Sequence, residues 1–182
     1  MKRRLQLLKN LAVVAVATLF ASCSADNAPV GERIDALDAS AWKYSTWISA
    51  VDAPTTTDYN NGRAADGASW FVSTIRNEKP IASAKLMATS LGVFEIYINS
   101  KPIGNEFLKP GFTHVLKTRR SFTYDITDAF NSGANAENTL SAQVTPGWWA
   151  DKIVTPGGGN GMLGKKCALR AVLELTYADG SK

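Results

Sequence analysis

The sequence predicts an all-β domain, built as a β-sandwich or a jelly roll with one short helix. Three observations lead to this prediction: short segments in which apolar and polar residues alternate, turn-forming residues between those segments, and the lack of any long amphipathic helical pattern. The chain has 182 residues, of which 45% are hydrophobic. A chain of this size can bury enough apolar surface to fold without a metal or a disulfide.

The first 22 residues have the pattern of an export signal. Only basic charges precede Cys23, and residues 11–20 form an apolar run that is shorter than the roughly 20 residues of a transmembrane helix. The sequence Leu-Phe-Ala-Ser-Cys at 19–23 resembles a bacterial lipobox, in which cleavage leaves a lipid-modified cysteine at the N-terminus. An ordinary signal peptide cut nearby, with Cys23 incidental, is the alternative. We therefore expect an exported lipoprotein, lipidated on Cys23 and anchored to the bacterial membrane, at the outer membrane or the cell surface.

Residues 23–41 are polar and weakly patterned, with Pro29 and Gly31 among them. This composition is typical of a tether, so we expect the folded domain over residues 42–182. The four basic residues of the signal account for the whole net charge of +4, which leaves the rest of the chain about neutral. A neutral domain lacks the basic surface that nucleic acid requires, and we expect no nucleic-acid partner.

Five segments of the domain alternate with the two-residue period that is typical of half-buried antiparallel strands. They cover residues 70–76, 82–90, 93–99, 140–145 and 167–177. In the third segment Phe94, Ile96 and Ile98 share one face, and Val93, Glu95 and Tyr97 share the other. Turn-forming residues separate the segments at 61–62, 66–67, 99–102, 109–111, 131–133 and 146–147.

The short helix is predicted near residues 127–132. Asp125 or Thr127 can cap its first turn, and Gly133 suits its end. Asp125 therefore has a structural explanation before any catalytic one.

The end of the domain carries a turn signal. Asp179-Gly180 follows the last strand and predicts a hairpin, but no return strand follows in the sequence. We expect a domain truncated at its C-terminus, and the alternative is an edge strand with a frayed tail.

Few residues are suited to catalysis or to metal binding. His114 is the only histidine, which excludes metal sites that need two histidines, and its loop context favours an ordinary surface residue. Cys167 begins an apolar strand, so we expect a buried and inert thiol. Glu95 lies on a strand face, either buried or beside a cleft. We assign no catalytic residue, no metal ligand and no required cofactor.

Trp148 and Trp149 follow Pro146-Gly147 and form the most distinctive local feature. Exposed aromatic rings stack on the apolar faces of sugar rings, so these two residues are our candidates for carbohydrate contact. The alternative is that they pack against another domain or against the end of the sandwich.

Several motifs resemble, in order and approximate spacing, the N-terminal domain of bacterial α-L-rhamnosidases. They lie at residues 83–86, 91–99, 109–113, 124–128, 147–149 and 173–180. The segment at 47–50 resembles the short tryptophan segment that precedes this domain in the family. The chain departs from the family at Asn99-Ser100, where Asn-Gly is usual, and at Pro146, where a glycine is common. Both departures fall in loops.

The resemblance implies a jelly-roll β-sandwich of the galactose-binding type, without catalytic residues. In the family, the catalytic carboxylates lie in a separate helical barrel that hydrolyses terminal α-L-rhamnose with inversion. Some related modules bind rhamnose with the help of Ca²⁺, so calcium is an expectation from the resemblance alone.

We therefore expect a non-catalytic module that recognises substrate for a rhamnosidase or supports it, and that is inactive by itself. Its expected partners are rhamnose-containing glycans or a separate catalytic domain. A stand-alone rhamnoside-binding surface lipoprotein is the alternative.

Overall fold

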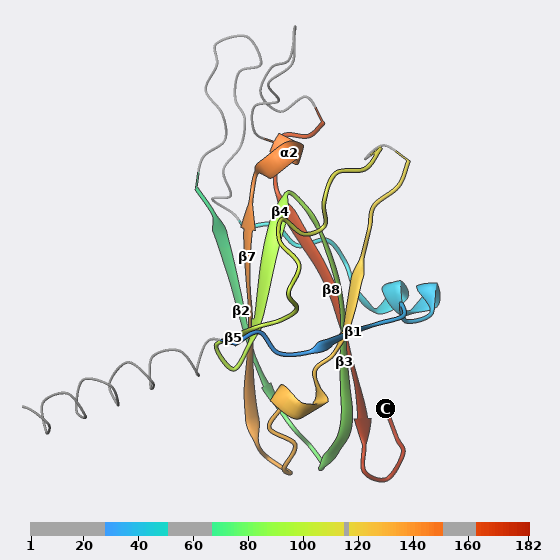
Figure 1. Ribbon diagram of the computed structural model, residues 1–182. Coiled ribbons are helices and arrows are strands. Elements are labelled where there is room, and N and C mark those ends of the chain that lie inside the picture. Colours follow the sequence, from blue (N-terminus) through green and yellow to red (C-terminus); the bar gives the residue numbers. More distant parts are fainter. Residues whose placement is uncertain (1–27, 51–66, 115–116, 151–162) are drawn as a thin grey trace, which may run out of the picture.

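Two four-stranded antiparallel sheets face each other in the computed structural model, which describes residues 28–50, 67–114, 117–150 and 163–182 (Figure 1). The first sheet has the order β1 (Glu32–Ile34), β6 (Phe122–Asp125), β3 (Ile81–Leu91) and β8 (Ala168–Tyr177). The second sheet has the order β2 (Ser69–Arg76), β7 (Glu137–Thr145), β4 (Val93–Ile98) and β5 (Lys101–Pro102). The prediction of an all-β sandwich is confirmed.

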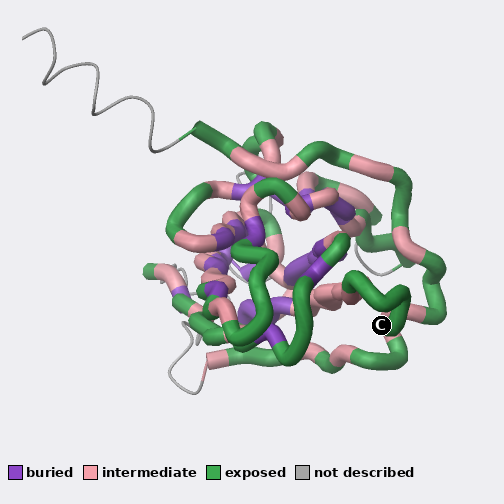
Figure 2. The backbone as a smooth tube through the Cα atoms, turned by 90° about the horizontal axis from the view of Figure 1, so that it is seen from below, coloured by how far each residue is buried: buried purple, intermediate pink, exposed green. Residues whose placement is uncertain are grey.

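The core lies between the two sheets, where Figure 2 shows the buried backbone positions gathered inside an exposed outer layer. In β4 the side chains of Phe94, Ile96 and Ile98 are at most 1% exposed, while the residues between them are partly exposed. In β3 Ala84 and Leu86 face them from the other sheet and are fully buried. The alternation in the sequence thus corresponds to one buried and one partly exposed face of β4, because successive side chains of a strand point to opposite faces.

Gly92 is the single residue between β3 and β4, although these strands belong to different sheets. Its φ of +118° lies in a region that side-chain-bearing residues rarely adopt, and a Cβ atom here would overlap the carbonyl oxygen of Thr145. The glycine therefore allows the chain to pass directly from one sheet to the other.

Three strands were not expected from the sequence: β1, β5 and β6. They are short, and the pairing of β1 with β6 joins Arg33 to Tyr124, two residues that are far apart in the sequence. β1 falls within residues 23–41, which the pattern assigns to a tether. Over its described part this segment instead contributes an edge strand and hydrogen bonds to the domain, with Val30 donating its N–H to Pro102.

The helical elements also differ from the expectation. The helix expected near residues 127–132 is the 3-10 turn η2 (Thr127–Ala129), in which Asp125 accepts a hydrogen bond from the Thr127 N–H at 3.0 Å. It ends early because Phe130 adopts an extended backbone and enters the core. Two further short helices were not expected: η1 (Ala39–Tyr44), capped by Asp38, and α2 (Gly147–Ala150).

The turn signal after the last strand is confirmed, because Gly180 donates its N–H to Tyr177 at 2.9 Å and Asp179 forms an ion pair with Lys79 at 2.7 Å. Within the described residues, no helix has the length and apolar character that crossing a bilayer would require.

Candidate functional site

The two candidate tryptophans lie at the upper end of the sandwich in Figure 1, where α2 follows β7. The helix is a single turn, in which the N–H groups of Trp149 and Ala150 both donate to the carbonyl of Pro146. Gly147 begins it and packs so closely on Val93 that a Cβ would overlap that side chain. This close approach fixes α2 directly over the start of β4.

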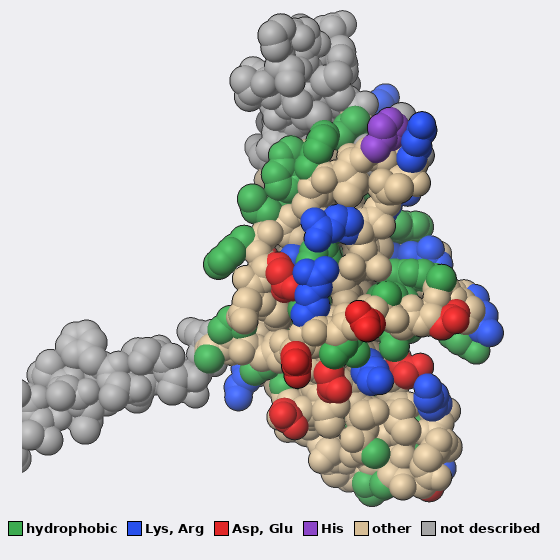
Figure 3. Space-filling model, turned by 45° about the vertical axis from the view of Figure 1, so that its right-hand side comes forward, with side chains coloured by type: hydrophobic (Ala, Val, Ile, Leu, Met, Phe, Trp, Pro, Cys, Tyr) green, Lys and Arg blue, Asp and Glu red, His purple; other side chains and the backbone are tan. Residues whose placement is uncertain are grey.

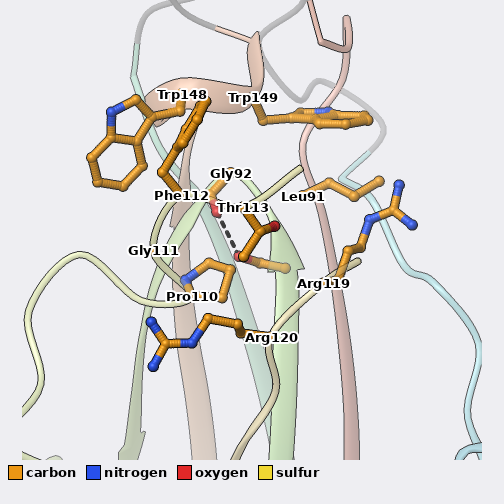
Figure 4. A pocket seen from close by; sticks show the side chains of 11 residues that line it. Leu91, Gly92, Pro110, Gly111, Phe112, Thr113, Arg119, Arg120, Trp148 and Trp149 are labelled. Atoms are coloured by element: carbon orange, nitrogen blue, oxygen red, sulfur yellow. Dashed lines mark hydrogen bonds between the residues drawn. The ribbon is translucent and has the colours of Figure 1, made fainter. Parts of the chain in front are cut away.

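A shallow hollow opens beside α2 (Figure 4). Its walls come from the β3–β4 turn, from residues 110–113, from residues 119–120 and from α2 itself. We call it the tryptophan hollow. Figure 3 shows hydrophobic side chains gathered at this upper end of the molecule, with Lys and Arg side chains on the face below them.

Trp148 projects from the surface at the rim of the hollow. Its side chain is 36% exposed, and its ring meets that of Phe112 edge to face, with 6.3 Å between the ring centroids. Phe112 is itself 62% exposed. Two aromatic rings that remain open to solvent form an apolar platform of the kind that stacks on sugar rings.

Trp149 is held in place by the protein instead. Its indole Nε1–H donates to the carbonyl of Lys166 at 2.9 Å, and Gly164 lies so close to the ring that a side chain there would overlap it. The guanidinium of Arg119 lies over the same ring, 5.7 Å from its centroid. The two candidate tryptophans therefore separate into an exposed ring, Trp148, and an anchored one, Trp149.

A second hollow adjoins the first and is lined by Trp42, Trp47, Thr89, Arg119, Ser121 and Arg170. Trp47 reaches this position because Ile48 exchanges two backbone hydrogen bonds with Leu169 of β8, at 2.9 and 2.8 Å. Arg170 donates hydrogen bonds to the carbonyls of Trp42 and Ser45 and so fixes the η1 segment against the sheet.

Glu95 is paired with a buried cation. Its carboxylate lies 3.0 Å from the Nζ of Lys109, a side chain with no solvent exposure, which also donates to the carbonyl of Ile103 at 2.8 Å. The carboxylate itself is about one-third exposed. The sequence left Glu95 either buried or beside a cleft. In the structure it is partly buried, as the partner of Lys109 in an ion pair.

Glu106 is a second carboxylate with partly buried contacts. It accepts a hydrogen bond from the Tyr124 hydroxyl at 2.7 Å and lies 3.2 Å from Arg33. Burial raises the pKa of Glu106, but the Tyr124 hydrogen bond and the Arg33 charge outweigh it, and the pKa lies below its ordinary value. Glu106 is ionised at neutral pH and does not suit the role of the protonated general acid in a glycosidase.

Cys167 and His114, which the sequence analysis also considers, lie where it expects them, in the core and on the surface. Cys167 is buried, and burial raises the pKa of its thiol to about 11, in keeping with an inert core residue. His114 is exposed in a loop. Cys23 lies outside the described residues. Within the described part of the chain, no three His, Cys, Asp or Glu side chains are grouped so as to hold a metal ion.

The sequence analysis names Trp148 and Trp149 as candidate contacts, and it does not name Phe112, Trp47 or Arg119, which the structure places beside them. Phe112 lies within a motif of the resemblance, and its position beside a turn signal was the only local indication. Trp47 lies in the segment 47–50 that resembles the tryptophan segment of the family, and its place beside Arg119 depends on the long-range pairing of Ile48 with Leu169.

Comparison with known proteins identifies one family. The sequence pattern of the α-L-rhamnosidase N-terminal domain matches residues 79–182. An α-L-rhamnosidase from Streptomyces avermitilis is 40% identical over 103 residues, which are 57% of this chain and 10% of that protein.

Solved structures agree. A crystal structure of native α-L-rhamnosidase from Aspergillus terreus superposes with a TM-score of 0.66 at 27% identity, over 77% of this chain and 15% of that one. The Streptomyces avermitilis α-L-rhamnosidase complexed with L-rhamnose gives a TM-score of 0.57 at 35% identity, over 64% of this chain and 11% of that one. The chain thus spans between 10% and 15% of the length of these three matches.

Proposed function

The chain belongs to the α-L-rhamnosidase N-terminal domain family, and from this premise we propose that it is a non-catalytic module that recognises rhamnose-containing glycans for a rhamnosidase. Hydrolysis of terminal α-L-rhamnose is then the task of a catalytic barrel outside this chain. The observation that carries the proposal is the platform of Trp148 and Phe112, which stays open to solvent at one end of a rigid sandwich.

The carboxylates support a non-catalytic role. Glycosidases need one carboxyl group with a raised pKa as general acid and a second carboxylate close to it. In the described residues four carboxyl groups have pKa values below their ordinary range. These groups are Asp38, Glu106, Asp125 and Asp179. Glu95 is engaged by Lys109.

The first test separates recognition from catalysis. The purified chain is incubated with an aryl α-L-rhamnoside, and we expect no release of rhamnose above background. Titration calorimetry with methyl α-L-rhamnoside is expected to show binding, and the same titration in EDTA reports whether that binding needs a metal ion. Turnover well above background would refute the proposal.

The second test locates the binding surface. We expect Trp148→Ala to weaken rhamnoside binding about tenfold or more, which corresponds to about 1.4 kcal/mol. Trp70→Ala is the matched control, because Trp70 is also exposed but stacks on Tyr97 on the outer face of the second sheet. If the two substitutions have equal effects, or if Trp148→Ala leaves binding unchanged, the rhamnoside-binding site does not lie at α2.

In the second version of the proposed function, the module supports a catalytic domain and does not bind sugar. The anchored Trp149 favours it, because an indole fixed by Lys166 and Gly164 stabilises the end of the domain rather than a ligand. In that case the chain binds no rhamnoside and increases the activity or stability of a separately expressed rhamnosidase barrel. Binding with no such effect would favour the stand-alone rhamnoside-binding lipoprotein.

We further propose that the chain is exported and lipid-anchored through Cys23. The basic start, the short apolar run and the lipobox-like residues 19–23 support this. Expressed in a bacterial host with labelled palmitate, the chain is expected to incorporate label and to fractionate with membranes, and Cys23→Ala is expected to do neither. Labelling that survives Cys23→Ala would contradict the anchor.

A further inference from the structure

Arg119 joins the two hollows at the α2 end of the molecule. It lines the tryptophan hollow and also the second hollow, which contains Trp42 and Trp47. Its guanidinium lies over the ring of Trp149 at 5.7 Å and over the ring of Trp47 at 5.8 Å. A charged group is therefore held at the junction of two concave surfaces.

Stacking on the two indole rings leaves the edge of the guanidinium available. A cation–π contact uses the flat face of the group, whereas its five N–H donors point outward in the plane. Arg119 is an exposed residue. The two rings restrict its side chain in advance, which lowers the entropy lost when it binds a ligand.

No acidic side chain occupies that edge in the described part of the chain, where the ion pairs of Glu and Asp involve Arg33, Lys79, Lys109 and Lys182. The sequence around Arg119 is also basic, since residues 107–124 contain four Lys and Arg residues and no Asp or Glu. Lys109 among them is neutralised by Glu95. Lys117, Arg119 and Arg120 therefore lie close together in the sequence with no acidic residue among them, which favours an anionic ligand over a cationic one.

The neighbouring arginines are placed differently. Arg170 also lines the second hollow, but its donors are taken by the carbonyls of Trp42 and Ser45. Arg120 follows Arg119 directly, and Figure 4 shows its guanidinium beneath Pro110, while that of Arg119 extends on the side of Trp149. Arg119 is therefore the arginine that lines both hollows. Within the described residues, no carboxylate forms an ion pair with it.

We propose that this end of the domain selects acidic rhamnose-containing saccharides, with a neutral sugar ring on Trp148 and Phe112 and an anionic group of the same or an adjoining sugar at Arg119. This inference rests on the proposed sugar recognition and adds the substrate class. The anionic group is a carboxylate or a sulfate ester, both of which match the planar fork of a guanidinium. A neutral glycan would leave that donor edge to water.

The test compares matched acidic and neutral ligands by calorimetry. One pair is a rhamnosyl-uronic acid disaccharide and its methyl ester, and the other is a sulfated methyl rhamnoside and its unsulfated parent. At low salt we expect the acidic member of at least one pair to bind about fivefold more tightly, the upper range for a solvent-exposed ion pair. The difference is expected to shrink at high salt, because ions screen exposed charges. The pair that shows it identifies the anionic group.

Substitutions assign the effect to Arg119. Arg119→Gln is expected to abolish the preference, so that the acidic and neutral members of a pair bind with about equal affinity, and a circular dichroism spectrum like that of the parent reports that the variant is folded. Arg119→Lys is expected to keep only part of the preference, since it retains the charge but loses the fork and the stacking. Arg76→Gln is the matched control, because this exposed arginine lies at the end of β2 remote from α2.

The outcomes distinguish the two proposals. If neutral rhamnosides bind and the acidic ligands bind no better, the acidic preference is wrong and the proposed recognition stands. If none of the four ligands binds, the recognition proposal fails and this inference falls with it. A preference that survives Arg119→Gln, or that is lost in Arg120→Gln instead, overturns the assignment to Arg119.

Discussion

Lys109 carries a charge although its side chain is completely buried. Its ammonium group is satisfied by the carboxylate of Glu95 and the carbonyl of Ile103, and it lies 5.7 Å from the ring centroids of both Phe94 and Tyr124. A buried charge is tolerated only where such partners replace water. The pair links the segment before the tryptophan hollow to the core strand β4.

Lys109→Met keeps most of the side-chain volume but leaves Glu95 and the Ile103 carbonyl without their donor. We expect the free energy of unfolding to fall by about 2–3 kcal/mol, the lower range for breaking one side of a buried pair, because Glu95 is partly exposed and can hydrate. Glu95→Gln retains an acceptor and is expected to cost about 1 kcal/mol. Urea denaturation measures both, and a Lys109→Met variant as stable as the parent would show that the ion pair contributes no net stability.

At the scale of elements, the passage from β3 to β4 depends on one residue. Gly92 combines a positive φ with a close approach to the carbonyl of Thr145, so a methyl group at this position meets backbone that cannot move aside. The same passage sets the position of α2, because Gly147 packs on Val93, the first residue of β4.

Gly92→Ala is expected to lower the free energy of unfolding by more than about 2 kcal/mol, since backbone strain and steric overlap add. Gly180 is the matched control: its φ is +81° but it has open space around the Cβ position. Gly180→Ala therefore retains only the conformational cost of about 1 kcal/mol. Thermal or urea unfolding compares them, and similar losses in the two variants would contradict a steric role for Gly92.

At the scale of the whole molecule, ionised carboxylates hold together segments that are distant in the sequence. Glu106 connects the segment after β5 to β6 through Tyr124 and to β1 through Arg33. Asp125 accepts hydrogen bonds from the side chain and the backbone of Thr127, the first residue of η2, and these hydrogen bonds lower its pKa. The folded protein therefore holds these groups ionised more strongly than the unfolded chain does.

Acid is expected to destabilise the fold. Because the pKa values of Glu106 and Asp125 are lower in the folded state, the unfolded chain takes up protons first as the pH falls. The stability that these groups contribute is complete above their ordinary pKa values near 4 and is lost progressively below them. Glu106→Gln is expected to flatten the decline of the melting temperature between pH 5 and about pH 3. An unchanged slope in this variant would exclude Glu106 as a source of acid sensitivity.

The sequence by itself determined the fold class and the five long strands. These features depend on local alternation, and burial of Phe94, Ile96 and Ile98 follows from a period of two residues whatever the partner strand is. It also marked Trp148 as a candidate contact, because a Pro-Gly turn next to paired aromatics is a local signal.

Tertiary structure alone decided which strands pair and which side chains meet at the α2 end. The short strand β1 gains its hydrogen bonds from β6, and its own three residues have no pattern that predicts them. Likewise Trp47, Arg119 and Trp149 come together only because Ile48 pairs with Leu169 and the connection before β6 lies beside α2. Contacts between residues so distant in the chain depend on strand order and register, which no local sequence pattern contains.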